Sequence, residues 1–198
     1  QNSFEIYSPN KTEANKYMNV AFAVSCLSFE PGSETWAFKS LYGVSVAELT
    51  ATQMSTLQEK NISYFTEYGG KAITQGGKTV NGEWIDTVRF MWWLKAFMQN
   101  CIYNLFVTNP KIPYTDGGIA LVENQMIYAL KRGQKMGGIS PTEYDEDGNA
   151  VPGFTVTVPL ARELTQAERA SRQLKGCKFT ARLAGAVHFV EVRGTLEY

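Results

Sequence analysis

Residues 83–108 read EWIDTVRFMWWLKAFMQNCIYNLFVT, the most apolar stretch of the chain and the one that decides its fold. On a helical wheel its apolar residues form two adjacent stripes. One stripe holds Phe90, Leu94, Phe97, Cys101 and Leu105, and the other holds Trp84, Val88, Met91, Met98 and Ile102. So wide an apolar arc predicts a helix that is covered on most sides, either in the core or against neighbours.

Amphipathic segments lie on both sides of this helix. After an extended link at Pro110 and Pro113, a second helix is expected to end at Gly137-Gly138. Its inward side chains should be Ile119, Val122, Met126, Ala129 and Leu130. Upstream, residues 12–27 also show helical periodicity. Their inward face is expected to hold Met18, Ala21 and Ser25, extended by Tyr17, Val20, Val24 and Leu27.

Four other stretches predict strands. Residues 35–41 and 61–68 come first, and the glycine pairs that follow the second stretch predict a hairpin. Residues 154–158 alternate apolar and polar side chains, which is typical of a half-buried strand. A long β segment is expected over residues 177–198.

Helices interspersed with paired strands predict an α+β fold, in which mixed helices pack on a small β-sheet. Capping boxes at Thr50 and Thr165 support two more helices, the second running to Gly176. We expect an N-terminal helical segment at residues 1–30 and one compact domain at residues 31–198. Since the sequence opens without Met, we expect it to be a fragment of a longer protein.

Charge and composition argue against several classes of protein. Nineteen Lys and Arg balance nineteen Asp and Glu, whereas a general binder of nucleic acid or anionic membranes carries a basic excess. Cys26, Cys101 and Cys177 are odd in number and far apart, unlike a disulfide framework. With His188 as the one histidine, we expect no metal site and no cofactor. The longest apolar run, residues 20–27, is too short for membrane insertion.

The apolar pattern changes phase within the last β segment. Apolar side chains occupy odd positions up to Leu183 and even positions from Val190 onward, so a turn, a bulge or a departure from the sheet is needed near Gly185. One interpretation is a hairpin packed on its own domain. The other is a strand pair available for exchange, in which the chain end joins another subunit's sheet. The contacts in that exchange would come from Val190, Val192, Leu196 and Tyr198.

The terminal motifs, in their order, resemble the C-terminal region of contractile phage tail sheath proteins. They are FTARLAGAVH at 179–188 and VEVRGT at 190–195. Ahead of them, in the family's order, stand TWAFK at 35–39, WID at 84–86, KIPYTDGGI at 111–119, GGI at 137–139 and FTVTVP at 154–159. The likeness covers most of residues 30–198, and complete sheath proteins are usually longer, with variable outer domains.

This resemblance implies a structural protein rather than an enzyme, with residues 31–198 as a tail-sheath C-terminal domain. Sheath subunits polymerise as a helical array around a tail tube and contract to drive the tube through a cell envelope. Neighbouring subunits exchange terminal arms as added strands. The implied partners are other copies of the chain, the tail tube protein, and baseplate and tail terminator proteins. The implied location is the virion tail, assembled in the host bacterial cytoplasm.

A basic face on the expected helix at 165–175 is a candidate for contact with the tube. Arg169 and Arg172 come close together in the sequence, and Lys175 follows them. A weak electrostatic contact with an acidic tube would align the sheath and still release it. The alternative is a solvated face on which Glu168 and Arg172 form an i,i+4 pair.

Two functions of other classes remain open. Residues 72–79 resemble a relaxed phosphate-binding loop, so Gly77-Lys78-Thr79 would serve a nucleotide-binding enzyme. Such a loop needs a helix that begins at the Lys-Thr pair, but Asn81-Gly82 predicts a turn there. A glycine-rich hairpin tip is the simpler interpretation. The second alternative is a monomeric binding module, which would not associate at any concentration.

Overall fold

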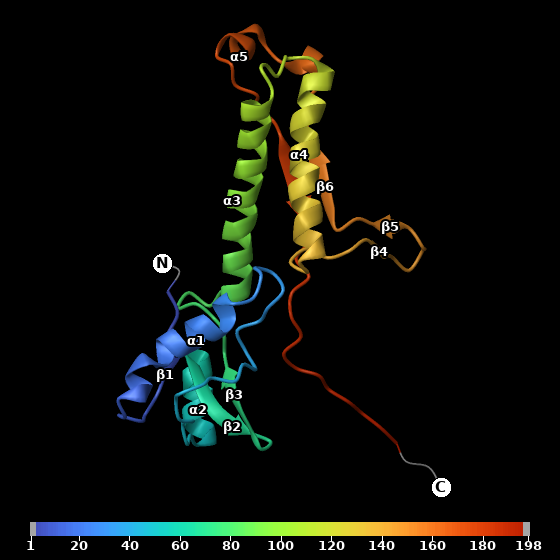
Figure 1. The fold of residues 1–198 in the computed structure, drawn as a ribbon. Helices are drawn as coiled ribbons and strands as arrows, with labels where there is room; N and C mark the ends of the chain where they lie inside the picture. Colours follow the sequence, from blue (N-terminus) through green and yellow to red (C-terminus); the bar gives the residue numbers. More distant parts are fainter. Residues whose placement is uncertain (1–2, 196–198) are drawn as a thin grey trace. The chain divides into compact units, whose positions relative to one another are not determined.

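The computed structural model describes residues 3–195, and the predicted α+β fold is confirmed (Figure 1). The described chain divides into two compact units. Unit 1 holds residues 3–26, 35–83 and 185–195, and unit 2 holds residues 27–34 and 84–184. The expected separation of residues 1–30 from a domain at 31–198 stays a prediction.

Unit 1 is built on a three-stranded sheet with the order β1-β2-β3. β2 (Ser63–Tyr68) and β3 (Lys71–Gln75) form the predicted antiparallel hairpin, and β1 (Ile6–Tyr7) pairs parallel to β2. Gly69 and Gly70 close the hairpin with φ of 59° and 76°. Glycine adopts these angles without a steric penalty, so the pair permits the tight turn.

The helices of unit 1 follow their expected limits closely. A 3₁₀ turn, η1 (Ala14–Tyr17), leads into α1 (Met18–Leu27). α2 (Ala51–Glu59) begins at the predicted capping box, in which Thr50 Oγ1 accepts from Gln53 N at 3.3 Å. This cap satisfies a backbone donor that would otherwise lack a partner at the helix start.

α1 buries only part of the face that was expected. Met18 is buried as predicted and Ala21 and Ser25 are half-buried, but Phe22 and Cys26 complete the buried face. The predicted extension is wrong, because Tyr17, Val20, Val24 and Leu27 are exposed. Phe22 decides the orientation, because its ring packs edge-to-face on Phe4 and Trp36 at centroid distances of 5.6 and 5.1 Å. A helical wheel shows which residues share a face, but it does not show whether one aromatic ring or several smaller apolar side chains will be buried.

Residues 35–41 do not form the predicted strand. Phe38 has a φ of 60°, which interrupts an extended chain. The segment is instead a loop held against β3, since Phe38 N donates to Thr74 O and Thr74 N donates to Lys39 O, both at 2.8 Å. The prediction took Trp36 and Phe38 as strand residues on either side of Ala37. It was wrong because Trp36 and Ala37 are neighbours and both are buried, whereas neighbouring side chains in a strand face opposite sides.

Two long helices, α3 (Ile85–Thr108) and α4 (Asp116–Lys135), lie side by side in unit 2 (Figure 1). Their shared buried cluster contains Phe90, Leu94, Met98, Cys101, Met126, Ala129, Leu130 and Ile139. The inward face predicted for α4 is confirmed at every position. Among the described helices, none combines the length and apolar character that a bilayer crossing requires.

α3 is less covered than its sequence predicts. Trp93 and Phe97 stack with a 5.0 Å centroid distance at the margin of the buried cluster. Met91, Trp92 and Tyr103, however, are 45%, 63% and 67% exposed. The reason is that α4 and a small sheet cover only part of the helix circumference, which leaves part of the apolar arc open.

That small sheet consists of β6 (Phe154–Thr157) and β7 (Lys178–Ala181), an antiparallel pair. β6 shows the predicted alternation, with Phe154 and Val156 half-buried against the helices. The remaining elements are β4 (Glu143–Tyr144), β5 (Ala150–Val151), η2 (Ala161–Glu163) and α5 (Gln166–Ala170). β4 and β5 form a separate hairpin.

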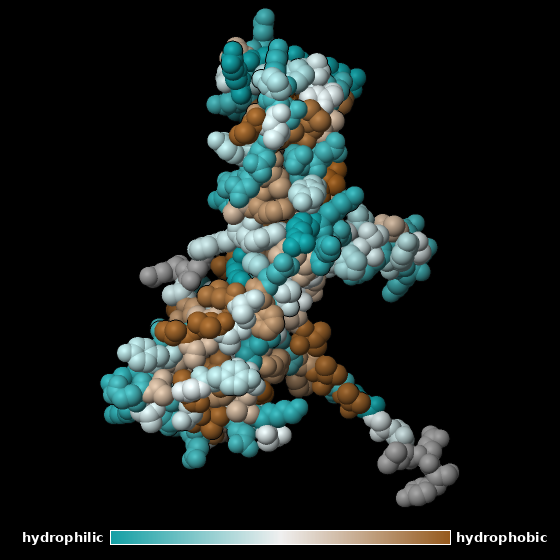
Figure 2. All heavy atoms as spheres, in the orientation of Figure 1, coloured by the Kyte–Doolittle hydropathy of each residue, from teal (hydrophilic) through white to brown (hydrophobic). Residues whose placement is uncertain are grey.

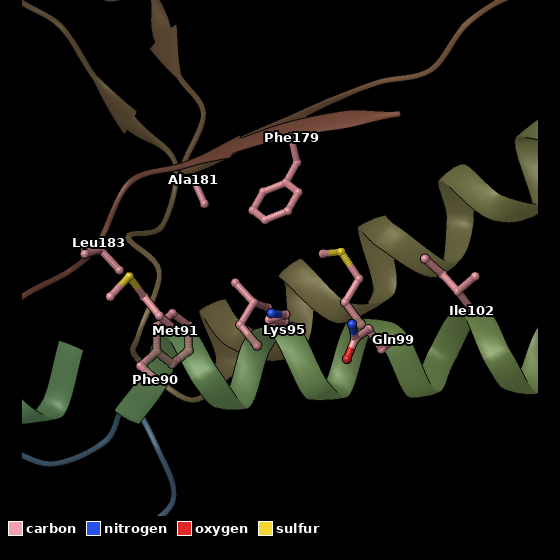
Figure 3. Close-up of a pocket in the computed structure, with 10 residues that line it drawn as sticks. Phe90, Met91, Lys95, Gln99, Ile102, Phe179, Ala181 and Leu183 are labelled. Carbon is pink, nitrogen blue, oxygen red and sulfur yellow. The ribbon is translucent and has the colours of Figure 1, made fainter. Parts of the chain in front are cut away.

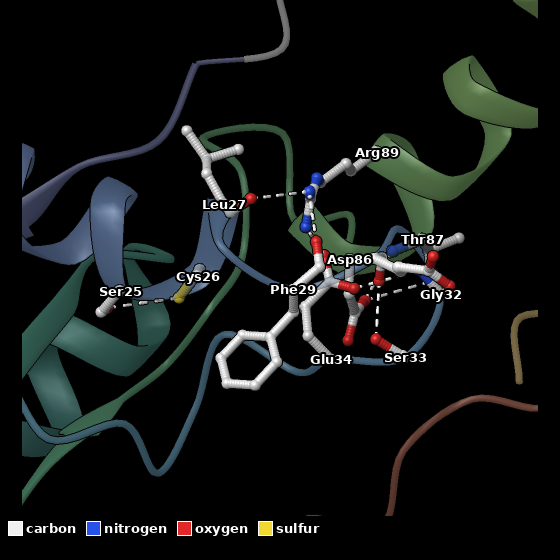
Figure 4. A network of polar contacts seen from close by, with 11 residues as sticks. Ser25, Cys26, Leu27, Phe29, Gly32, Ser33, Glu34, Asp86, Thr87 and Arg89 are labelled. Carbon is white, nitrogen blue, oxygen red and sulfur yellow. Dashed lines mark hydrogen bonds and ion pairs between the residues drawn. The ribbon is translucent and has the colours of Figure 1, made fainter. Parts of the chain in front are cut away.

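A polar network fastens the segment 27–34 to the start of α3 (Figure 4). Arg89 forms an ion pair with Glu34, whose side chain is fully buried. Arg89 also donates to the carbonyl oxygens of Leu27 at 3.3 Å and Phe29 at 2.7 Å, and Glu34 accepts from Gly32 N at 3.0 Å. Each buried charge is therefore paired and hydrogen-bonded, as burial requires.

Candidate assembly surfaces

The outer edge of β7 is an open strand edge. Arg182 N donates to Gly153 O, and Arg182 O accepts from Ser140 N, both at 2.8 Å, so this residue bonds toward the β6 side. Successive residues in a strand direct their backbone groups to opposite edges. The opposite edge therefore carries the N–H and C=O groups of residues 179 and 181 and the N–H of residue 183, whereas Leu183 O accepts from Ser140 Oγ at 3.2 Å. No strand within residues 3–195 pairs there.

An apolar groove of about 560 Å³ runs between this edge and α3 (Figure 3). Phe179 and Leu183 line it from the strand and are 42% and 44% exposed, and Met91 lines it from α3. Its other lining residues are Phe90, Leu94, Lys95, Met98, Gln99, Ile102 and Ala181. The sheet ends one strand too early to cover this stretch of α3, so an added strand would bury it.

The C-terminal segment carries the predicted donor residues. Val190 and Val192 are 70% and 85% exposed, and Val187 and Phe189 beside them are 78% and 84% exposed. In Figure 2, hydrophobic side chains lie along this segment ahead of its grey end. Leu196 and Tyr198 lie outside the described residues.

The long β segment expected from residue 177 onward is shorter in the structure. β7 ends at Ala181, a single bridge joins Leu183 to Ile139, and residues 184–195 have no regular secondary structure. Gly185, with a φ of 67°, stands where the phase of the pattern changes. A left-handed glycine lets the chain leave the sheet, which explains the change of phase.

The basic surface rests on a helix that is shorter than expected. α5 ends at Ala170, and Arg172 has a φ of 55°, so the helix predicted to reach Gly176 is wrong. The capping box is confirmed, since Thr165 N donates to Glu168 Oε2 at 2.9 Å and Glu168 N donates to Thr165 Oγ1 at 3.2 Å. The Thr165 backbone N–H and, at 2.8 Å, the Thr165 hydroxyl both donate to Glu168 Oε2 and so lower the pKa of this carboxyl. Among the described residues, no ion pair joins Glu168 to Arg172.

The two arginines of this surface have different surroundings. Arg169 donates to the carbonyl oxygens of Tyr114 and Ala161 and so ties α5 to the segment before α4. Arg169 and Arg172 both line a groove of about 780 Å³. Arg172 and Lys175 are exposed. The structure thus places both predicted arginines at one groove, but the Arg169 side chain is hydrogen-bonded to backbone carbonyls of its own chain.

The phosphate-loop pattern occupies β3 and the turn after it. Thr79 N donates to Glu83 O at 2.7 Å, which closes a turn, and the next helix begins at Ile85. No helix start therefore lies at Lys78 to hold a phosphate. The hairpin tip is at Gly69-Gly70 rather than at Gly76-Gly77. No group of three His, Cys, Asp or Glu side chains in the described chain could hold a metal ion.

The sequence analysis named candidate residues for strand exchange but did not predict the apolar groove beside β7. Two patterns in the sequence could have indicated this groove. Phe179, Ala181 and Leu183 alternate on one face of a strand, and the apolar arc of α3 is wider than one partner helix can cover. Taken together, these patterns predict a sheet that needs another strand.

Comparison with known families and structures agrees with this geometry. A family model described as "E217 tail sheath protein gp31-like, C-terminal domain" matches residues 85–196. Two solved structures share the fold: the anti-feeding prophage (AFP) baseplate, 6-fold symmetrised (TM-score 0.62, 15% identity), and an extracellular contractile injection system, the PVC sheath complex in its contracted state (TM-score 0.60, 14% identity). Both alignments cover 83% of this chain, which spans 45% and 46% of those chains. No curated protein matches the chain in sequence.

Proposed function

Because the chain belongs to the E217 tail sheath protein gp31-like family, whose C-terminal domain it matches, we propose that it is the self-assembling part of a contractile tail sheath. Copies polymerise as a helical array around a tail tube, and contraction drives the tube through a cell envelope. The further partners are baseplate and tail terminator proteins. The array belongs to the virion tail and is assembled in the bacterial cytoplasm.

The observation that carries this proposal is the open edge of β7 beside an apolar groove. A strand edge with free backbone groups binds another strand unless it is covered or charged. In this proposal the residues from Val190 onward, including Leu196 and Tyr198, leave one subunit and pair with the edge of the next. Val190 and Val192 are exposed in the free chain and so are available for burial.

The proposed linkage between subunits combines many contacts that are individually weak. Each added main-chain hydrogen bond contributes roughly 0.5–1.5 kcal/mol net. A buried valine side chain adds about 1.5–3 kcal/mol. Several bonds and a few apolar contacts therefore hold neighbours together, while the rest of each subunit remains able to rotate. Packed interfaces of this kind switch between discrete arrangements.

The direction of donation also suits a sheath. The donor segment and the acceptor groove are different surfaces of the same chain, so each subunit can give one strand and accept another. A contact between two different surfaces is head-to-tail, and such contacts propagate into rings or helical filaments. Arg172 and Lys175, with Arg169 beside them, are the proposed contact with an acidic tube.

Electron microscopy of the sheath subunit that contains this chain tests the proposal. Wild-type protein should form tubes or rings at high concentration, and deletion of residues 190–198 should leave soluble monomers. Tubes that persist after the deletion would refute strand exchange through this segment. A nucleotide-dependent rise in Tm that Lys78→Ala abolishes would favour an enzyme over a structural subunit. Monodisperse protein at every concentration would favour the binding module.

A further inference from the structure

One residue anchors the C-terminal segment to its own unit. Within residues 183–195, His188 is the residue that is not exposed. Its imidazole Nε2 lies 2.7 Å from Thr35 Oγ1. Its ring meets Phe38 edge-to-face, at a centroid distance of 5.5 Å and an interplanar angle of 89°. A hydroxyl donates well to an unprotonated imidazole nitrogen, and the edge-to-face geometry is a favourable one for aromatic pairs.

The receiving loop is held rigidly in place. Phe38 adopts a left-handed φ of 60°, and the residue is 42% exposed even with His188 against its ring. The fully buried Thr74 fixes this shape: its Oγ1 accepts from Lys39 N at 2.9 Å and donates to Trp36 O at 3.0 Å. Non-glycine residues rarely take this backbone conformation, and where surrounding bonds impose it the site is often functional. The loop thereby presents an aromatic ring at the surface.

We propose that His188 is a positioning residue that pins the C-terminal segment to Thr35 and Phe38 of its own subunit. The apolar residues beyond it, Phe189, Val190 and Val192, then leave from a fixed point toward the neighbouring subunit. This inference rests on the proposed strand exchange and adds to it the place where the donated strand departs. His188 thereby limits which neighbouring edges the strand can reach.

The contact of His188 with Thr35 and Phe38, here called the pin, shortens the flexible chain that connects the donor strand to the rest of the subunit. This flexible chain is called the tether. Upstream of His188, the next backbone anchor is Ala184 N, which donates to Gly138 O at 3.2 Å. Without the pin, residues 185–188 join the free tether and lengthen its reach by about 13 Å. A longer flexible tether lowers the effective concentration of the strand at its acceptor and widens the choice of acceptors. The pinned strand should therefore assemble more selectively.

NMR of the unassembled chain tests the contact itself, because its one histidine gives a single set of imidazole ring signals. We expect nuclear Overhauser effects from the His188 ring to the Phe38 ring and the Thr35 methyl. Thr35→Val removes the hydroxyl and keeps the shape, so it should cause loss of these effects and faster backbone motion in residues 185–190. Thr52→Val, an exposed threonine of α2, is the matched control and should change neither. Wild-type spectra without these effects overturn the proposal.

Assembly assays of the sheath subunit test what the pin does. His188→Ala and Thr35→Val should raise the concentration needed for tube formation and yield irregular tubes, with Tm unchanged. If both variants show a loosened segment yet assemble like wild type, the positioning role is wrong and strand exchange stands. If deletion of residues 190–198 also leaves assembly intact, the proposed function itself fails. The two failures are therefore distinguishable.

Discussion

Glu34 and Arg89 lie 55 positions apart in the sequence and form an ion pair in which the Glu34 side chain is fully buried and the Arg89 side chain is 19% exposed. The pair joins the segment 27–34 to the first turns of α3. Removing one member of a buried pair leaves the other charge without compensation, which is more costly than losing an exposed pair.

Arg89→Met should therefore lower the free energy of unfolding by about 3 kcal/mol, measured by urea denaturation. The loss includes the hydrogen bonds to the carbonyl oxygens of Leu27 and Phe29. Lys16→Met is the matched control, because Lys16 pairs with Glu13 on the surface with both side chains exposed. It should cost less than about 1 kcal/mol. Equal losses in the two variants would contradict the role assigned to the buried pair.

Charged substitutions in the groove between β7 and α3 should block assembly without unfolding the subunit. Leu183→Lys and Phe179→Lys place an ammonium group where the free chain is partly exposed, so the monomer tolerates it. An added strand would bury that charge at a high desolvation cost. Val151→Lys, at an exposed position in the β4–β5 hairpin, is the control and should assemble normally. Sedimentation of tubes measures the difference, and normal assembly of the groove variants would count against the acceptor site.

The residues of the basic surface should have two different roles: Arg172 and Lys175 should affect attachment to the tube, and Arg169 should affect the stability of the fold. Arg172→Glu with Lys175→Glu should weaken attachment to the tube, most clearly at low salt, while Tm stays unchanged. Arg169→Ala should instead lower the free energy of unfolding by about 1 kcal/mol, because its bonds to two carbonyl oxygens are lost. Lys131→Glu, an exposed lysine late in α4, controls for charge alone. Tube binding that survives the double reversal argues against this contact.

Acid should loosen the start of α5. Hydrogen bonds from Thr165 hold the pKa of Glu168 below its ordinary value, so folding favours the ionised carboxylate. Its stabilisation is complete above the ordinary glutamate pKa and is lost as the pH falls through the lower pKa of the folded state. Carbon-detected NMR titration measures this pKa directly. Thr165→Val removes the hydroxyl bond and should move the pKa part of the way back, whereas an unchanged value would show that the hydroxyl does not lower it.

Local patterns in the sequence determined the elements that depend on neighbouring residues. The capping boxes at Thr50 and Thr165 and the hairpin at Gly69-Gly70 appear in the structure as predicted, because caps and turns are set within a few residues. The inward face of α4 was also correct, because its apolar residues form a single stripe, which packs on α3 and β6. Motif order along the chain was enough to indicate the family.

Tertiary structure decided which apolar surface is buried and which remains open. The sequence marks α3 as apolar nearly all round, but only packing shows that α4, β6 and β7 cover part of it and leave a groove. Phe38 and Arg172 have left-handed backbones that no local pattern predicted; residues 35–41 form no strand, and the predicted helix up to Gly176 ends early, at Ala170. Burial, backbone strain and strand edges depend on contacts between residues far apart in the sequence, so they could not be obtained from periodicity alone.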